Sequence, residues 1–449
     1  MNSKRQIVLE LNELCPHLLQ EFMNQGALPN LSQIYSHADC YETHVDCDLG
    51  QLEPWTQWVT VHTGVSSEKH KIHRLGQAQN LEYDSIWDIL SRRGFSSWLC
   101  GSMNTKWDQN DQHIMAIPDP WSINAESSPK SLDTFYEFVR ANVQEHTNAR
   151  FKQSLQKNLE FLIFMLGHGL SVRTVSMLIQ QMLRQIRNAP DQWKKPFLLD
   201  CLQFDVFSHV YRKNKPDFAT FFSNSTAHFQ HKFWRYMEPE AFTLKPSDDE
   251  IKQYQNAILS AYQNHDALVG KALDLADSQT SIVISTAISQ RPFSELDEVG
   301  GKRFYRPYSL KEIPSIFELE HVVDVCPVMS HQFYVVFESE QQAIFAAQQL
   351  KEYTVEGEAL FSVRHQAKRV FLGCRIIRVL KGQPKINAIN RELSFFDVFY
   401  LADNLKSGAH SSKGVLWIYN QNRQQTIFKE PLPLESVMTR LLDEYDMAS

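Results

Sequence analysis

Short apolar runs alternate with stretches of helical periodicity along most of the chain. The apolar runs have the length of buried strands; they are QIVLEL (6–11), SSWLCG (96–101), PFLLDCLQF (196–204), FATFFSN (218–224) and SIVIST (281–286). The segments between them that favour helices are 18–31, 85–94 and 250–276. Strands that alternate with helices predict an α/β fold with a mostly parallel central sheet flanked by helices.

Two segments interrupt this alternation. In 151–195, the stretch SVRTVSMLIQQMLRQIR (171–187) has apolar residues at helical spacing and arginines on its other face, so we expect a helical insert. This insert either packs on the body, covers the site as a lid or lies on a membrane surface. Residues 321–382 show a strand, a helix and two strands, which predicts a small α+β insert that caps the site. The predicted core comprises 1–150, 196–320 and 383–449.

Composition places the chain among ordinary globular proteins. Its 449 residues are 43% hydrophobic and 22% charged, which is sufficient for a large core. The formal net charge of -7 provides no broad basic field, so nucleic acid is not an expected partner. The sequence does not indicate an oligomeric state.

The cysteines and the apolar stretches bear on localisation. Seven scattered cysteines without Cys-x-x-Cys spacing argue against zinc ribbons and redox motifs and favour a reducing compartment. The apolar stretch near the N-terminus is too short for a signal peptide, and the window that begins at Phe161 is too short to span a bilayer. We therefore expect a cytoplasmic protein without a transmembrane segment.

Polar residues stand at the ends of three predicted strands. Asn12 and Glu13 follow the first strand, 224–228 follow the fourth, and 285–290 end the fifth. Parallel strands bring their carboxyl ends to one edge of a sheet, where ligands bind in α/β proteins. The three loops are therefore expected to meet in one crevice.

Five segments stand in an order that resembles one protein family. They are IVLELNELCPHLLQEFMNQGALPNL (7–31), PWTQWVTVHTGVSSEKHKIHRLG (54–76), NSTAH (224–228), VISTAISQ (283–290) and KSGAHSSKGVLWIYN (406–420). In this order they resemble the alkaline phosphatase superfamily, in particular its type I phosphodiesterase and sulfatase-like branches. The resemblance implies an alkaline-phosphatase-like sandwich and chemistry on a phosphate or sulfate ester.

The resemblance also implies catalytic roles. The family places its nucleophile at the start of the helix in the second segment, where backbone N–H groups favour a bound anion. Thr56 is the hydroxyl nearest that helix start. His228 or His410 would act as general acid or base.

The metal ligands of the family are only partly retained. His228 and His410 stand at ligand positions, whereas neutral residues replace the other ligands; these are Asn12, Asn224, Thr286 and Ala287. A two-metal site is therefore not expected, because carboxylates offset the charge of two divalent ions. One divalent ion (Zn, Mn or Mg) at His228 and His410 is an alternative, with His231, Glu13 or Glu10 completing its shell.

Without a metal, the same groups would form a hydrogen-bonding pocket for an anion. Amides and hydroxyls in place of carboxylates remove negative charge from a crevice that accepts an anionic ester. The predicted substrate-binding residues are Asn12, Glu13, Asn224, His231, Thr286, Ser289 and Gln290.

Two functions of different classes follow. The first is a hydrolase or transferase for a phosphate or sulfate ester of a nucleotide, sugar or glycan precursor, with a reduced or absent metal requirement. The alternative is a pseudoenzyme of the same fold that binds an anionic metabolite or glycan. A third interpretation is a structural protein that uses the helix at 171–187 as its interface.

Overall fold

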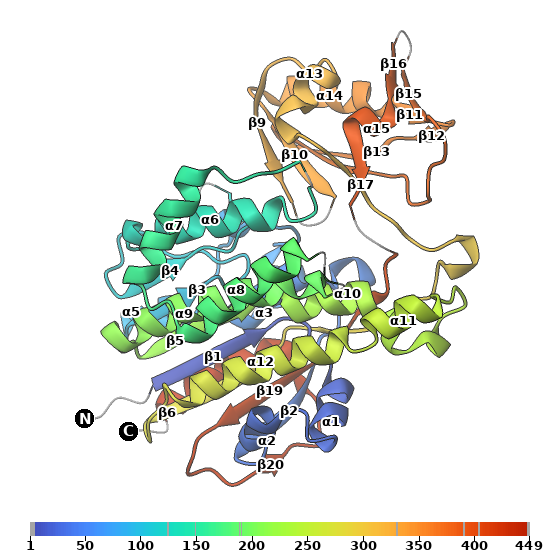
Figure 1. The fold of residues 1–449 in the computed structure, drawn as a ribbon. Coiled ribbons are helices and arrows are strands. Elements are labelled where there is room, and N and C mark those ends of the chain that lie inside the picture. The colour runs from blue at the N-terminus through green and yellow to red at the C-terminus, as the bar shows by residue number, and fades with distance from the viewer. Residues whose placement is uncertain are drawn as a thin grey trace.

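A nine-stranded sheet crosses the molecule (Figure 1). The computed structural model describes residues 5–446, except 124, 149, 188, 190, 329–330, 389–390 and 403–404. The strand order is β20–β2–β19–β6–β1–β5–β3–β4, and β21 also pairs with β2. The strands are β1 Arg5–Leu11, β2 Ala38–His44, β3 Ser97–Cys100, β4 Ile114–Ile117, β5 Phe218–Ser223, β6 Thr280–Ser285, β19 Lys413–Tyr419, β20 Thr426–Ile427 and β21 Leu432–Pro433. Only β19 runs antiparallel to its neighbours in this sheet, which confirms a mostly parallel sheet.

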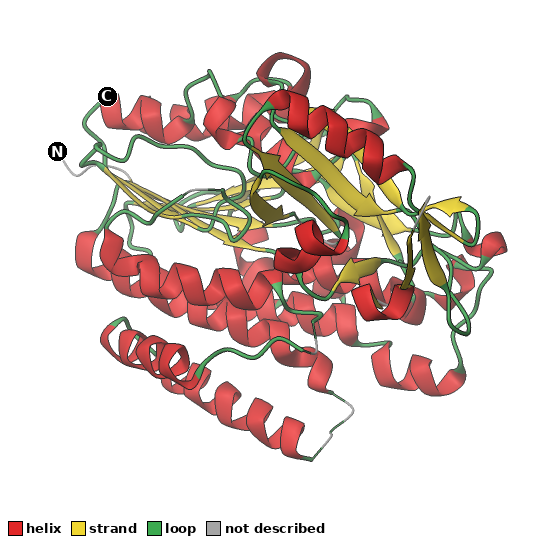
Figure 2. Cartoon of the chain, turned by 90° about the horizontal axis from the view of Figure 1, so that it is seen from above, coloured by secondary structure: helices red, strands yellow, loops and turns green. Residues whose placement is uncertain are grey.

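Helices cover both faces of this sheet (Figure 2). Strand β1 shows why: Ile7, Leu9 and Leu11 join one hydrophobic cluster, while Val8 joins another on the opposite face. The first cluster includes helices α1 Pro16–Asn24, α2 Pro29–Tyr35, α6 Asp133–Gln144, α9 Lys195–Asn214, α10 Ser225–Met237 and α12 Ala257–Leu273. The second includes α3 Pro54–Thr63, α5 Ile86–Arg92 and α16 Val437–Asp446. The predicted α/β class, with helices flanking the sheet, is confirmed.

Two local predictions were wrong. The run 196–204, expected as a strand, is the first half of α9, because its buried residues Phe197, Cys201 and Phe204 continue at helical spacing into the next turns. A short apolar run cannot by itself distinguish a buried strand from a buried helix. The segment 250–276 forms two helices, α11 Asp248–Tyr254 and α12, instead of one.

The two interrupting segments form distinct structures. Residues 155–186 form α7 Leu155–Gly167 and α8 Val172–Ile186, an outer pair of helices. A separate hydrophobic cluster runs from Tyr305 to Phe399 and contains the predicted insert at 321–382. Its main elements are β8 Tyr305–Pro307, β9 Val322–Pro327, β10 Gln332–Phe337, α14 Glu340–Lys351, β13 Phe361–Gln366, β14 Arg369–Cys374, β15 Lys385–Ala388, β16 Arg391–Ser394 and β17 Phe399–Leu401. Among the described helices, none is long and apolar enough to cross a membrane.

Candidate metal centre

The turn after β1 places Glu13 at the centre of the site. Glu13 has a left-handed backbone with φ of 61°, which is uncommon for a residue with a side chain. Its backbone carbonyl accepts a hydrogen bond from Gln230 Nε2 at 2.8 Å. Gln230 is held in turn by the Tyr262 hydroxyl, which donates to Oε1 at 2.7 Å. Helices α10 and α12 thus fix the turn, and the Glu13 residue is 1% exposed.

Two histidines from distant parts of the chain face Glu13. His231 on α10 has Nε2 at 3.4 Å from Glu13 Oε2, and His410 on β18 (Gly408–Ser411) has Nε2 at 3.7 Å from Oε1. On the far side of each ring, Nδ1 lies against a backbone carbonyl, Gly408 at 3.0 Å for His231 and Leu52 at 2.8 Å for His410. Because a carbonyl only accepts, both Nδ1 atoms carry a proton, and both Nε2 atoms are directed at the carboxylate.

The electrostatics of this group favour a bound cation. Burial lowers the pKa of His410 to about 4, so its ring is neutral at pH 7. Burial acts to raise the pKa of Glu13, but His410, His231 and a hydrogen bond from Gln290 hold it at about 2. An ionised carboxylate therefore faces the lone pair of a neutral imidazole, acceptor against acceptor, and a cation between them would satisfy both.

The three groups fit a divalent transition ion. Two imidazoles and one carboxylate form a known ligand set for zinc with one open position, and their ligand atoms all lie within 4.8 Å of one another. Tetrahedral ligands at about 2.0–2.1 Å from zinc lie roughly 3.3 Å apart, close to the separations of Glu13 from His231 and His410. The carbonyls behind Nδ1 are the partners that usually orient metal-binding histidines.

Amide side chains orient the Glu13 carboxylate. Gln290 on β7 (Ser289–Pro292) donates to Glu13 Oε2 and, at 2.9 Å, to the Ala227 carbonyl. Asn12 donates to Glu13 Oε1 at 3.1 Å and to Asn224 Oδ1 at 2.7 Å. Asn12 Oδ1 accepts from Trp58 Nε1 at 2.8 Å, so every polar hydrogen of its amide is in use. These amides position the carboxylate from behind.

A buried network anchors the start of α10, which carries His231. Ser225 Oγ donates to Asp200 at 2.5 Å, and Thr226 Oγ1 lies 2.8 Å from His265 Nδ1. The N-cap residue of α10 is Asn224, and the hydroxyls of Ser225 and Thr226 are committed to this network instead of to the helix end. The network fixes the first turn of α10 against α9 and α12.

A further carboxylate lies beside the centre, and the charges of two lysines act on it. Glu53, just before α3, has Oε2 at 3.3 Å from His410 Nδ1. Burial and the charge of Glu13 raise the pKa of Glu53 to about 7, and Lys406 and Lys302 oppose this shift. Burial lowers the pKa of both lysines. Glu53, Lys302 and Lys406 were not among the predicted site residues.

The remaining predicted site residues lie apart from the group of Glu13, His231 and His410. Thr56 is fully buried, and its hydroxyl makes no hydrogen bond within the described residues. The ring of His228 packs edge-on against His146 at 5.6 Å, and burial lowers its pKa well below the usual value. The hydroxyl of Thr286 accepts from the Val415 amide at 2.9 Å, and Ser289 pairs with Ser411 between β7 and β18; these contacts join strands.

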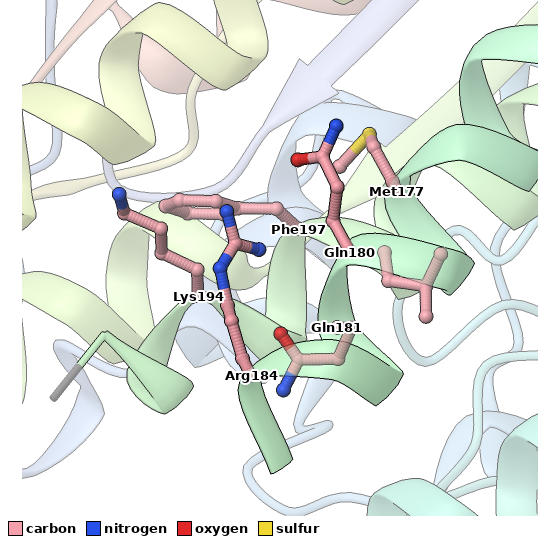
Figure 3. A pocket seen from close by; sticks show the side chains of 7 residues that line it. Met177, Gln180, Gln181, Arg184, Lys194 and Phe197 are labelled. Atoms are coloured by element: carbon pink, nitrogen blue, oxygen red, sulfur yellow. The ribbon is translucent and has the colours of Figure 1, made fainter. Parts of the chain in front are cut away.

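One pocket lies elsewhere, between α8 and the start of α9 (Figure 3). It has a volume of about 120 Å³, less than the roughly 300 Å³ at which pockets for small molecules begin. Its lining residues are Met177, Gln180, Gln181, Arg184, Lys194, Phe197 and Leu198. None of the residues around Glu13 lines it, so it is not part of the candidate centre.

Comparisons with known proteins give only distant similarity. No protein-family model matches the chain, and no curated protein matches it. Murine ectonucleotide pyrophosphatase/phosphodiesterase 5 is similar in structure, at 11% identity and a TM-score of 0.42, over 99% of this chain and 95% of that one. Phosphonoacetate hydrolase from Sinorhizobium meliloti 1021, in complex with phosphonoformate, gives 12% identity and a TM-score of 0.45 over 99% and 96%.

Proposed function

We propose that this protein hydrolyses small anionic phosphate esters with one divalent ion held by Glu13, His231 and His410. The observation that carries the proposal is the convergence of one buried carboxylate and two Nε2 atoms, each ring fixed through Nδ1 by a backbone carbonyl. When bound, such an ion supplies Lewis-acid polarisation of an ester oxygen and activation of water.

The proposal includes divergent membership of the alkaline phosphatase superfamily. In support, the segments that resemble that family at 7–31, 224–228 and 406–420 contribute Asn12, Asn224 and His410 to one edge of the sheet. The amides of Asn12 and Asn224 are hydrogen-bonded to each other, where the family has metal-binding carboxylates. This pairing favours one ion over two, because two divalent ions need more negative charge nearby.

The flanking charges supply substrate recognition. Lys302 and Lys406 lie within electrostatic reach of Glu53, and Lys406 also of Glu13, so an anionic ester at the centre would meet both ammonium groups. Among the described residues no group donates a hydrogen bond to the buried Glu53 Oε2, so this carboxyl can hold a proton beside the substrate. The two lysines would bind the negative charge of the ester, and Glu53 would hold a proton. Neither role requires the Thr56 hydroxyl.

The direct test is turnover by the protein purified without a metal-affinity tag. Stripped protein, and protein reloaded with zinc or manganese, would be assayed on p-nitrophenyl phosphate and bis-p-nitrophenyl phosphate. We expect release of p-nitrophenol only from the reloaded protein, and loss of turnover in Glu13→Gln. Equal turnover by stripped and reloaded protein would contradict the metal-dependent part of the proposal.

Lys406→Ala and Lys302→Ala are each expected to raise KM for these esters about 10- to 100-fold, since a charge-assisted hydrogen bond contributes roughly 1.5–3 kcal/mol. The matched control is Lys385→Ala, because the Lys385 ammonium pairs with Glu392 across β15 and β16, where both side chains are exposed. Steady-state kinetics would measure KM for the three variants, and only the two site variants should differ from the wild type. An unchanged KM in both site variants would remove the lysines from substrate binding.

Glu53→Gln is expected to stabilise the metal-free protein at about pH 8 by about 1–2 kcal/mol, with most of this gain gone at about pH 5. A carboxyl whose pKa is raised on folding, from 4.5 to about 7, destabilises the folded state as pH rises through that interval. Solvent screens part of this effect because the Glu53 side chain is 31% exposed. Urea unfolding of both proteins at the two pH values measures the difference, and a gain of equal size at both values would contradict the shift.

A second candidate is a pseudoenzyme that binds an anionic ester without turnover. The observation in its favour is that Thr56, which stands nearest to the family's nucleophile position, is fully buried and outside the group around Glu13. Calorimetry with inorganic phosphate on the reloaded protein would show binding that depends on Lys406, while the p-nitrophenyl esters stay intact.

A further inference from the structure

The outer helices α7 and α8 expose a concentrated apolar surface. Eleven of the 21 exposed large apolar side chains among the described residues fall between residues 155 and 186. Leu155 and Val172 are each 87% exposed, so these side chains are in water and not merely at the margin of the core. Single exposed apolar residues are normal, but a contiguous group of this kind marks an interaction surface.

The exposed residues follow one stripe along each helix. On α8 they are Val172, Val175, Ile179, Met182, Leu183 and Ile186. Their spacing of three and four residues keeps them on one side, while the opposite side buries Thr174 and Gln181 against the body. Most apolar side chains of α8 therefore face outward, and Met177 is the one that packs on the first cluster. On α7 the exposed set is Leu155, Leu159, Leu162, Ile163 and Leu166, again at spacings of three and four.

A pocket of about 120 Å³ lies beneath part of α8, at the start of α9, although Met177 of α8 contacts Cys201 of α9 at 3.6 Å beside it. Gln181 and Arg184 of α8 lie at the wall of this pocket (Figure 3). The view in Figure 2 shows both helices as an extra layer outside the helices that cover the sheet. The apolar stripes face away from the core and form part of the outer surface of the protein.

The charge of the same segment is opposite to that of the whole chain. Residues 151–187 contain one acidic residue, Glu160, and five basic residues, Lys152, Lys157, Arg173, Arg184 and Arg187, whereas the chain has a net charge of -7. Arg184 is paired with Asp191 at 3.0 Å and Lys157 with Glu137 at 3.8 Å, while Lys152, Arg173 and Arg187 are exposed. On α8, Arg173 and Arg187 directly follow the first and last residues of the stripe, so their guanidinium groups lie along its flank.

This charge distinguishes between two occupants of the surface. In a symmetric dimer the same patch faces itself, so the exposed cations of one copy would meet those of the other. An anionic lipid surface offers apolar depth for the stripe and negative headgroups for its flank. The apolar side chains would enter the interface while the arginines extend to the headgroups.

We propose that α7 and α8 form a docking surface for an anionic lipid bilayer. The surface comprises the exposed apolar stripes of both helices, with Arg173 and Arg187 contacting lipid phosphates. Binding is peripheral, because neither helix is long enough to span a membrane. The proposal does not depend on the chemistry at Glu13.

The test is flotation of this 449-residue chain with phosphatidylcholine vesicles, with and without a minority of phosphatidylglycerol. We expect binding to the mixed vesicles and little to phosphatidylcholine alone. Ile179→Gln combined with Met182→Gln should lower the partition coefficient at least about 150-fold, since burying each such side chain contributes about 1.5–3 kcal/mol. Arg173→Gln combined with Arg187→Gln should lower it about 30-fold, from roughly 1 kcal/mol per basic residue near the surface.

A matched pair on another surface provides the control. Ile344→Gln with Phe345→Gln changes two exposed apolar residues of α14, in the α+β insert at 321–382, and should leave vesicle binding unchanged. Circular dichroism of all variants would confirm intact folds, which is expected because every changed side chain is exposed. Absence of vesicle binding by the wild type would overturn the proposal. So would a concentration-dependent dimer in light scattering that Ile179→Gln with Met182→Gln abolishes, because this assigns the surface to a second copy.

Discussion

His231→Ala is expected to weaken zinc binding at least about 100-fold and to abolish metal-dependent turnover, because the substitution removes one of three protein ligands. The ring is already oriented: Nδ1 donates to the Gly408 carbonyl at 3.0 Å, which leaves Nε2 at 3.4 Å from Glu13 Oε2. Calorimetric titration of stripped protein with zinc measures the loss. Elemental analysis of protein purified without an affinity tag gives the same answer for the natural ion.

The matched control for His231→Ala is His228→Ala. Both histidines lie on α10, three residues apart, but the His228 ring packs against His146 and is absent from the group around Glu13. We expect His228→Ala to retain zinc binding within about threefold of the wild type, on the ground that it removes no ligand. The reverse result, with zinc lost in His228→Ala and kept in His231→Ala, would place the ion at the pair that the family resemblance implies.

Gln290→Ala probes how much the surrounding amides matter for the same ion. Its amide donates to Glu13 Oε2 and to the Ala227 carbonyl, so its loss frees the carboxylate to turn. Partners of metal ligands typically contribute 10- to 100-fold in affinity, so this variant should fall between the wild type and His231→Ala.

The sequence carries much of the fold because the central strands are apolar on both faces and end in polar residues. The strands β1, β5 and β6 are recognisable on that basis, and parallel pairing brings their ends together. The first half of α9 misleads for the same reason: it is as apolar as a strand, and its helical period becomes clear only over the full 20 residues.

The site is only partly accessible from the sequence. The sequence indicates Glu13 because this residue follows a predicted strand, and it indicates His410 because this residue lies in a segment that resembles the family. It predicts His231 only as an additional ligand. Which histidine of α10 faces Glu13 depends on the rotation of that helix, which the buried contacts of Ser225 and Thr226 with α9 and α12 determine.

The sequence around the charged residues that flank the centre gives no indication of their role. Glu53, Lys302 and Lys406 come from three loops far apart in the sequence, and lysines in loops are usually solvated. Only the tertiary fold brings them to the same centre, where their mutual charges and burial shift each pKa. Thr286 is the opposite case, because it stands where the resembled family has a metal ligand. In this structure its hydroxyl instead accepts a hydrogen bond from the Val415 amide, which joins two strands.

Arg235→Ala is expected to lower the free energy of unfolding by about 3–5 kcal/mol, the largest stability effect that we predict for one substitution. Arg235 lies on α10 one turn after His231, and its guanidinium contacts both oxygens of Asp297 at 2.9 and 2.8 Å. The two side chains are 4% and 2% exposed. The same guanidinium donates to the Leu244 carbonyl at 2.7 Å and lies over the Phe242 ring at 4.1 Å.

The loss in Arg235→Ala arises mainly from the Asp297 carboxylate that remains. Burial acts to raise the pKa of Asp297, and the Arg235 guanidinium holds it below its usual value, so the alanine variant leaves a buried charge without its counter-ion. Replacing both partners with apolar residues of similar size, Arg235→Met with Asp297→Leu, should recover at least half of the loss, because no charge is then left unpaired. Urea unfolding of the wild type, the single variant and the double variant measures both effects. If the double variant is destabilised as much as Arg235→Ala, the ion pair itself, and not the unpaired carboxylate, stabilises the segment that holds His231 in place.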